Sequence, residues 1–288
     1  MTIPGRFSRR DFLKLSGSAL GGLFLSTLGL DSVQAAESLL GRVAYNKVTV
    51  YEIPSKAGNK VKTFKFDDLL EIRKQVTGGE ESDYNRAWYQ LSDGEYVYSG
   101  GIQPVKNLQN SPVTVIPKEG LLAEITVPFT DTRWKPTLLS RRGYRLYYGT
   151  TYWVKAIFAD EKKNLWYRIY DDLFELVFFI RAEHMRILPP EELAPLSPDV
   201  PEAYKSILVS LPEQRMAAYE DDRLVFSAKI SSGVGKGARH YASTPTGGFG
   251  TFFKRPAAHM SGGDGESSFY DLPGVPWASY ITDGGVSF

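Results

Sequence analysis

The residues most able to do chemistry lie between Ser227 and Thr251, where a glycine-rich loop separates two apolar stretches. A phosphate-binding role for this loop is excluded by its spacing. Gly235-Lys236 is followed by glycine instead of Ser or Thr, and position 230 is isoleucine, so the G-x-x-x-x-G-K-[ST] pattern is not met. The chain also has no G-x-S-x-G or S-x-x-K sequence, the usual settings of a nucleophilic serine in acyl transfer. We therefore expect a flexible loop between two strands.

Cysteine is absent from the 288 residues, which excludes disulfides, thiolate metal sites and a thiol nucleophile among them. The histidines are His184, His240 and His259, and no pair has H-x-x-x-H spacing. A zinc site is therefore not expected, nor is any other cofactor. Imidazole can serve as a general base near neutral pH. However, His240 and His259 fall in predicted loops and His184 at a predicted strand end, so we expect none of them to be catalytic.

The glycine-rich loop is preceded by three predicted strands. Residues 206–211 alternate between apolar and polar side chains, and residues 216–219 and 224–230 predict a hairpin across an acidic turn. After the loop, Thr244-Pro245 predicts an extended entry to a further strand, in which Phe249, Thr251 and Phe253 alternate on one face.

The order of these segments resembles that of the L,D-transpeptidases of the YkuD type, cysteine acyltransferases of bacterial cell walls. Their signature "S-x-G … T-P-x-G-x-F" is matched by Ser231-Ser232-Gly233 and by residues 244–249. Their opening phrase is matched by Lys205, Ile207, Val209, Gln214 and Tyr219. The resemblance covers residues 201–288. It implies acyl transfer, in which a cysteine thiolate attacks the carbonyl of an L-to-D peptide bond, a histidine takes the proton and backbone N–H groups hold the oxyanion.

The catalytic residues of that family come from an H-G … S-H-G-C-x-N run, which has no counterpart here. Residues 275–288 match the strand that leads into it, and the chain stops where its first histidine is expected. No catalytic residue is therefore carried over, and at most Tyr280 and Phe288 are expected to approach the substrate groove. Three interpretations stay open: a truncated L,D-transpeptidase, a non-catalytic wall-binding protein, and a split protein whose other half is a separate chain. Termination in mid-strand favours the first of these, because it would leave an unpaired sheet edge.

The N-terminus resembles a twin-arginine export signal. Ser8-Arg9-Arg10 and the residues up to Lys14 precede an uncharged run at 15–30, and Val33-Gln34-Ala35 offers the small residues that a signal peptidase accepts. The run is shorter than the ~20 residues of a membrane-spanning helix. We therefore expect the twin-arginine machinery to deliver the protein to the periplasm, cell wall or extracellular space, and contact with the membrane during export only.

Two stretches between the signal and residue 188 resemble each other. Ala87-Trp88-Tyr89 and the strand after Asp93-Gly94 recur as Leu165-Trp166-Tyr167 and residues 177–180, and residues 72–76 match 154–158. Both copies resemble bacterial SH3-like barrels. Their tryptophans could line grooves for glycan or peptide stems, but spacing favours a place in the core.

The prediction is thus a mainly β protein: two tandem SH3-like small barrels followed by an incomplete, β-sandwich-like L,D-transpeptidase domain. The predicted boundaries are a signal at 1–35, barrels at 36–112 and 113–188, a proline-rich linker at 189–201 and the transpeptidase part at 202–288. The resemblance implies peptidoglycan stem peptides or glycan as the partner. A net charge of +1 gives no reason to expect a nucleic acid.

Overall fold

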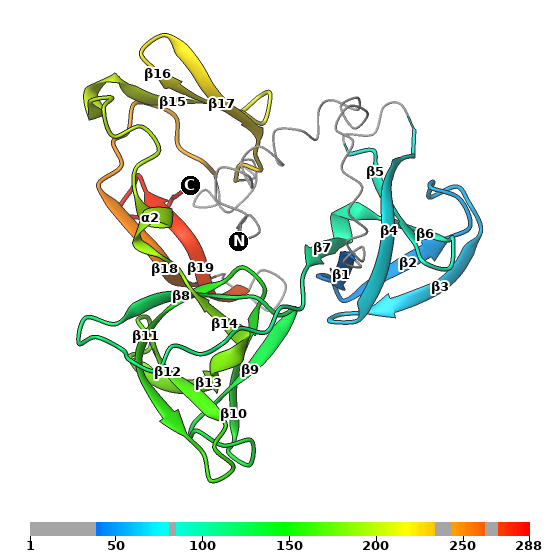
Figure 1. The fold of residues 1–288 in the computed structure, drawn as a ribbon. Coiled ribbons are helices and arrows are strands. Elements are labelled where there is room, and N and C mark those ends of the chain that lie inside the picture. Colours follow the sequence, from blue (N-terminus) through cyan, green and yellow to red (C-terminus); the bar gives the residue numbers. More distant parts are fainter. Residues whose placement is uncertain (1–38, 81–84, 234–242, 263–269) are drawn as a thin grey trace, which may run out of the picture. The chain divides into compact units, whose positions relative to one another are not determined.

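The computed structural model describes residues 39–80, 85–233, 243–262 and 270–288, and its fold is mainly β, as predicted (Figure 1). The predicted export signal at 1–35 lies outside the described residues, as does most of the glycine-rich loop with His240. The chain divides into two compact units. Of the described residues, the larger unit holds 39–187 and 254–278, and the smaller holds 188–253 and 279–288.

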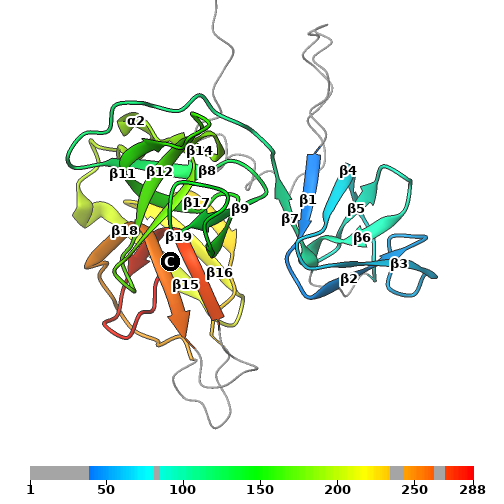
Figure 2. The same cartoon turned by 90° about the horizontal axis from the view of Figure 1, so that it is seen from below.

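The first repeat is a seven-stranded antiparallel sheet in the order β3-β2-β6-β5-β4-β1-β7 (Figure 2). The predicted turn at Asp93-Gly94 is present: Gly94 has φ 94°, and its N–H donates to the carbonyl of Leu91 at 3.0 Å. The strands, with one 3-10 turn, are β1 Leu39–Val43, β2 Lys47–Tyr51, β3 Lys60–Lys65, β4 Leu69–Thr77, β5 Ala87–Leu91, β6 Tyr96–Tyr98, η2 Ser99–Gly101 and β7 Ile102–Val105.

The second repeat has the same strand order, β10-β9-β13-β12-β11-β8-β14. Each of its first four strands starts 82 residues after its counterpart, as Leu121 does after Leu39. The register shift at Ile72/Lys74 in β4 recurs at Val154/Ala156 in β11. Its elements are β8 Leu121–Ile125, β9 Phe129–Arg133, β10 Arg142–Tyr147, β11 Thr151–Ala159, β12 Leu165–Asp171, β13 Leu176–Arg181, η3 Ala182–His184 and β14 Met185–Ile187.

Both sheets are open along their described strands. β3 and β7 form the edges of the first sheet, β10 and β14 those of the second, and no pairing closes either into a barrel. The SH3-like resemblance of the two repeats therefore remains a prediction, whereas their common strand order is a property of the structure.

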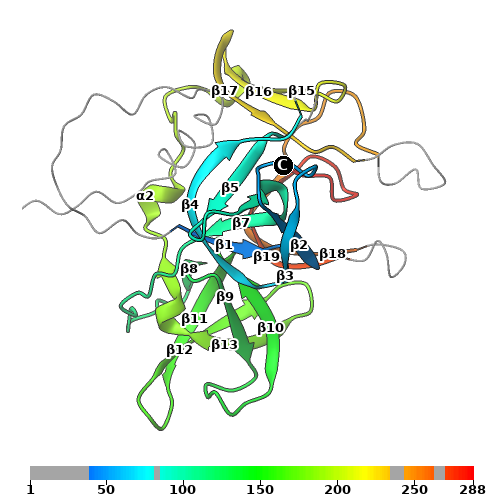
Figure 3. The ribbon, with the colours of Figure 1, turned by 90° about the vertical axis from the view of Figure 1, so that its right-hand side faces the viewer.

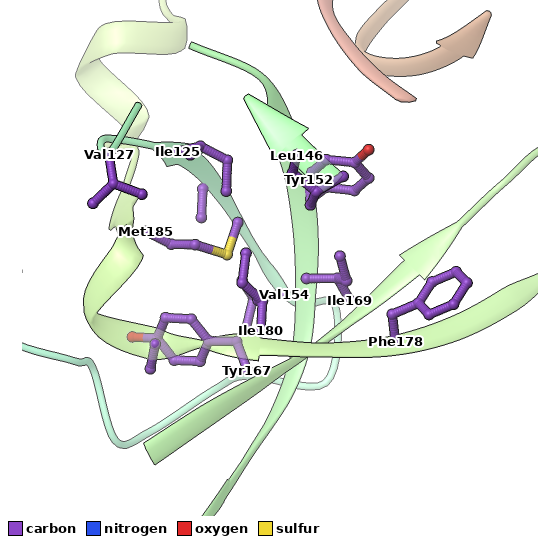
Figure 4. Close-up of a cluster of buried hydrophobic side chains, with 12 residues drawn as sticks. Ile125, Val127, Leu146, Tyr152, Val154, Tyr167, Ile169, Phe178, Ile180 and Met185 are labelled. Atoms are coloured by element: carbon purple, nitrogen blue, oxygen red, sulfur yellow. The ribbon is translucent and has the colours of Figure 1, made fainter. Parts of the chain in front are cut away.

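Each repeat has its own hydrophobic core, because the inward residues of its alternating strands are apolar. The second core is the larger one; it contains Leu146, Tyr167, Phe178 and Ile180 (Figure 4). The first contains Val43, Val50, Leu70, Ile72, Tyr89, Leu91, Val97 and Ile102. Trp88 and Trp166 are both fully buried, which agrees with a structural role.

The predicted linker contains one helical turn, α2 Pro190–Leu193, and is followed by the 3-10 turn η4 Glu202–Tyr204. It leads into a three-stranded sheet of β15 Lys205–Ser210, β16 Arg215–Glu220 and β17 Arg223–Lys229, close to the predicted strands (Figure 3). None of the residues in these three strands is buried. The sheet is therefore held by hairpin pairing without a core of its own.

The last described elements form a two-stranded sheet, β18 Phe253–Gly262 and β19 Tyr270–Tyr280. Two details differ from the sequence-based expectation. His259 lies in β18 and not in a loop, and residues 249–252 are not part of a strand. Phe249 and Phe252 are exposed there, and the Phe252 N–H donates to the carbonyl of Tyr280, the last residue of β19, at 3.2 Å.

Candidate functional site

Gln214 joins two of the motif segments that suggested chemistry. Its side-chain amide donates to Ser232 Oγ at 2.7 Å, and its side-chain carbonyl accepts the Ser232 N–H at 2.9 Å. Its backbone carbonyl also accepts the Ile230 N–H at 2.9 Å. One glutamine therefore fixes the backbone and side chain at the end of β17, where the glycine-rich loop begins.

The local backbone places Gln214 for this task. It closes the turn between β15 and β16 with φ 50°. The carbonyl of Leu211 accepts its backbone N–H at 3.3 Å and its side-chain amide at 2.6 Å. A non-glycine residue with positive φ is uncommon and is retained where its surroundings fix it. The bonds to Leu211 and Ser232 supply that fixation here.

The third motif segment is tied to the same place by Thr244. Its hydroxyl accepts the Gly233 N–H at 2.8 Å, so the two described ends of the glycine-rich loop meet. The sequence T-P-T-G-G-F then runs exposed, with Gly247 at φ 139°. The arrangement of Gln214, Ser232, Gly233 and Thr244 joins three motif segments by hydrogen bonds, but contains no base or thiol.

Tyr280 and Phe288, the predicted groove residues, lie close to each other in a small antiparallel pairing. Ser279 and Phe288 exchange two backbone hydrogen bonds of 3.0 Å, and Tyr280 faces Ser287. Successive residues of a strand point to opposite faces, so Phe288 shares the face of Ser279 and Tyr280 points to the other. The Tyr280 ring stacks on Phe253 with centroids 5.9 Å apart. The two rings therefore present two different surfaces.

His259 is buried, and its Nδ1 contacts Asp171 Oδ2 at the end of β12. The rings of Tyr144 and Phe174 meet the imidazole edge-on, each with its centroid 5.2 Å away. The other oxygen of Asp171 accepts the N–H groups of Leu173 and Phe174 at 3.2 and 3.0 Å. An aspartate that orients an imidazole is also a catalytic arrangement, but this pair is enclosed by side chains and anchors β18 to the second repeat.

His184 lies in η3, and its Nδ1 is 2.8 Å from Thr130 Oγ1. Burial lowers the pKa of this imidazole, while the neighbouring Glu183 carboxylate acts in the opposite direction. Its surroundings belong to the second repeat, not to the motif segments, which makes it a structural histidine.

Residues 204–285 match the YkuD model, the L,D-transpeptidase catalytic domain. This match agrees with the resemblance that the motifs indicated. The match covers less than a third of the chain, and no curated protein matches.

The matched residues 204–285 occur in both compact units. Residues 204–253 and 279–285 are in the smaller unit, and residues 254–278 are in the larger. Within the described ranges no group of three or more His, Cys, Asp and Glu side chains is suited to hold a metal ion. No helix of the described ranges has the length and apolar character to cross a bilayer.

Sequence reasoning found the motif residues of the L,D-transpeptidase domain but missed two of the connections that they make. The bond between Gln214 and Ser232 spans 18 positions, and the contact between His259 and Asp171 spans 88. The motif did contain a signal for the first, because glutamine and serine both belong to it. No local spacing indicates the second.

Proposed function

We propose that this protein is an exported L,D-transpeptidase-family protein of peptidoglycan remodelling, which binds stem peptides through its C-terminal region. The match of residues 204–285 to the catalytic domain carries the proposal. The hydrogen bonds of Gln214 with Ser232, and of Gly233 with Thr244, support it, because they hold three family segments in one place.

The family reaction needs a thiolate, which the 288 residues do not contain. The proposed role of this chain is therefore substrate binding, with Tyr280 and Phe288 as contacts to the stem peptide. Acyl transfer by the family mechanism requires a nucleophile from residues outside this sequence.

The nucleophile is tested by incubation of the 288-residue chain with a carbapenem, followed by intact-mass analysis. We expect no covalent adduct and no exchange of stem peptides. An adduct would contradict this part of the proposal and would identify a serine or lysine as the true nucleophile.

Substrate binding is tested by titration of the full chain with soluble muropeptides that carry tetrapeptide stems. We expect saturable binding that Tyr280→Ala weakens and Phe288→Ala weakens separately, because the two rings lie on opposite faces. If both variants bind as the unchanged chain does, the assignment of these two residues is wrong.

A non-catalytic wall-binding protein is the second candidate. It is favoured by the position of both hydrophobic cores in the two repeats and by the absence of cysteine. Peptidoglycan from which an amidase has removed the stem peptides separates the two functions. Binding that survives stem removal supports glycan recognition by the repeats, whereas loss of binding supports stem recognition.

Export by the twin-arginine pathway belongs to the same proposal and rests on Arg9, Arg10 and the uncharged run after them. Replacement of both arginines by lysine should retain the protein in the cytoplasm at its uncleaved size. Normal export of that variant would contradict a twin-arginine signal.

A further inference from the structure

Two loops occupy corresponding positions in the two repeats: residues 52–59 connect β2 to β3, and residues 134–141 connect β9 to β10. They have the same length and the same order of exposed and half-buried positions. They also share four hydrogen bonds donated by backbone N–H groups. In the first repeat the N–H groups of Glu52, Ser55 and Gly58 donate to the carbonyls of Asn59, Ile53 and Ser55, and that of Ala57 donates to Ser55 Oγ. In the second repeat the N–H groups of Trp134, Thr137 and Ser140 donate to the carbonyls of Arg141, Lys135 and Thr137, and that of Leu139 donates to Thr137 Oγ1. The two loops are therefore conformational equivalents.

Their outermost side chains differ in kind. Where the first repeat has Lys56 and Ala57, the second has Leu138 and Leu139, whose side chains are 56% and 97% exposed. A single exposed leucine on a protein surface is ordinary, but two adjacent ones at a loop tip form an apolar point that none of the described residues covers. Trp134, also exposed, adds apolar surface at the base of the loop.

The charges within this loop have one sign. Arg133, Lys135, Arg141 and Arg142 lie within the loop or beside it, and positions 132–142 contain no acidic residue. The side chains of Lys135, Arg141 and Arg142 are exposed. Arg142 lies 3.7 Å from the Asp131 carboxylate, so Lys135 and Arg141 are the cationic groups of the loop itself that favour a negatively charged partner beside Leu138 and Leu139.

The loop is also held in shape before any partner binds. Ser140 Oγ accepts the Lys135 N–H at 3.0 Å, and its carbonyl accepts from the Arg133 guanidinium at 3.1 Å. The Trp134 ring packs on the core residue Phe178, with centroids 4.8 Å apart. The leucines are therefore presented outward at little further cost in conformational entropy.

We propose that the loop at residues 134–141 docks on the surface of an anionic lipid membrane, with Leu138 and Leu139 entering the acyl-chain boundary and the cationic side chains at the headgroups. Exposed apolar side chains gain by leaving water, and Lys or Arg near an anionic leaflet gains by electrostatic attraction. Tryptophan favours the same interfacial depth. The inference does not rest on the proposed function, and it departs from the expectation that the protein meets the membrane only during export.

Membranes fit the loop better than an anionic wall polymer or a second copy of the chain. A hydrated polymer offers charge but no apolar phase for two leucines. A second copy would bring the same cationic groups together around the apolar contact, which like-charge repulsion opposes. An anionic bilayer satisfies both features at once.

The absence of cysteine allows a site-specific test in the full chain. Leu139→Cys carries an environment-sensitive fluorophore, and Ala57→Cys with the same fluorophore is the matched control in the equivalent loop. With vesicles of phosphatidylcholine containing one third phosphatidylglycerol, we expect brighter, blue-shifted emission from position 139 and no change at position 57. Pure phosphatidylcholine vesicles and high salt should both reduce the signal.

Affinity is then measured by vesicle co-sedimentation of full-length variants, so that any contribution of the N-terminal apolar run is common to all. Leu138→Lys with Leu139→Ala installs the side chains of the first repeat, and should weaken binding on the order of tenfold. Lys135→Gln with Arg141→Asn should weaken it on the order of tenfold and flatten the salt dependence.

Three results would overturn the proposal: equal emission changes at positions 57 and 139, equal binding to neutral and anionic vesicles, or unchanged affinity in both pairs of variants. An emission change at position 139 that depends on protein concentration without vesicles would likewise reject the membrane in favour of a second copy of the chain.

Discussion

The second repeat and the three-stranded sheet β15–β17 are both made of short antiparallel strands, but they bury very different amounts of side chain. The repeat encloses twelve buried residues in one cluster, whereas no residue of β15, β16 or β17 is buried. Strand pairing between sequence neighbours forms in both regions, because a hairpin needs only a turn and compatible edges. A core additionally needs a second layer to cover the sheet, and within the described ranges the two clusters of buried hydrophobic residues lie in the repeats.

The largest difference between the two regions is expected from the removal of an aliphatic side chain in each. Ile180→Ala in the core of the second repeat should lower the free energy of unfolding by about 3 kcal/mol, from lost burial and the cavity left behind. Leu208→Ala in β15, at 65% exposure, should change it by less than about 0.5 kcal/mol. Urea unfolding of the full chain, followed by tryptophan emission, measures both. Equal losses would show that β15 is covered by a core after all.

The next test concerns the anchoring of β18 on the second repeat. His259→Ala leaves the Asp171 carboxylate buried without its imidazole partner, which should cost about 2 kcal/mol. The neighbouring pair of Arg255 and Asp172 is the matched control, because its side chains are about one-third exposed.

Arg255→Ala should cost less than about 1 kcal/mol in the same unfolding measurement, since water and salt screen a partly exposed ion pair. A larger loss from Arg255→Ala than from His259→Ala would reverse the assignment of the anchor.

A smaller effect is expected in the three-stranded sheet from the loss of the Gln214 side chain. Gln214→Ala removes its bonds to Ser232 and should destabilise the end of β17 by about 1 kcal/mol. Hydrogen exchange at the amides of Ile230 and Ser232 should accelerate, while exchange in the second repeat stays unchanged. Ser232→Ala is the partner variant, and a double variant that costs the sum of the two single ones would contradict a direct coupling.

The smallest effect is a pH dependence confined to the second repeat. The pKa of His184 is lowered in the folded state by burial, so the folded protein binds this proton less readily than the unfolded chain. The stability that neutral His184 contributes is fully present above its ordinary pKa of 6.5. This stability is lost as the pH falls from 6.5 through the lowered pKa of the folded state. In the His184→Gln variant, the free energy of unfolding measured below pH 6.5 should depend less on pH than in the unchanged chain. An unchanged slope would show that other groups cause it.

Much of the fold follows from sequence patterns. The duplication was visible in the paired tryptophan segments, and both tryptophans proved to be buried. The strands at 205–229 and the turn at Asp93-Gly94 were also predicted, since period-two alternation and turn residues act over a few neighbours. The motif order located the L,D-transpeptidase region for the same reason, because its residues are close in the chain.

Other features were decided by tertiary structure. The strand expected at Phe249–Phe253 begins only at Phe253, because alternation creates a strand only where successive residues pair with a neighbour, and residues 249–252 make a single such bond, from the Phe252 N–H to the Tyr280 carbonyl at 3.2 Å. The equivalence of the loops at 52–59 and 134–141 rests on backbone hydrogen bonds, and of their side chains only Pro54-Ser55 and Pro136-Thr137 indicate it. The burial of His259 against Asp171 joins residues 88 positions apart. The sequence by itself determined the local strands, the repeat and the family motifs. Contacts between distant strands decided which sheet has a core and that His259 is enclosed, because burial depends on which residues the folded chain brings together.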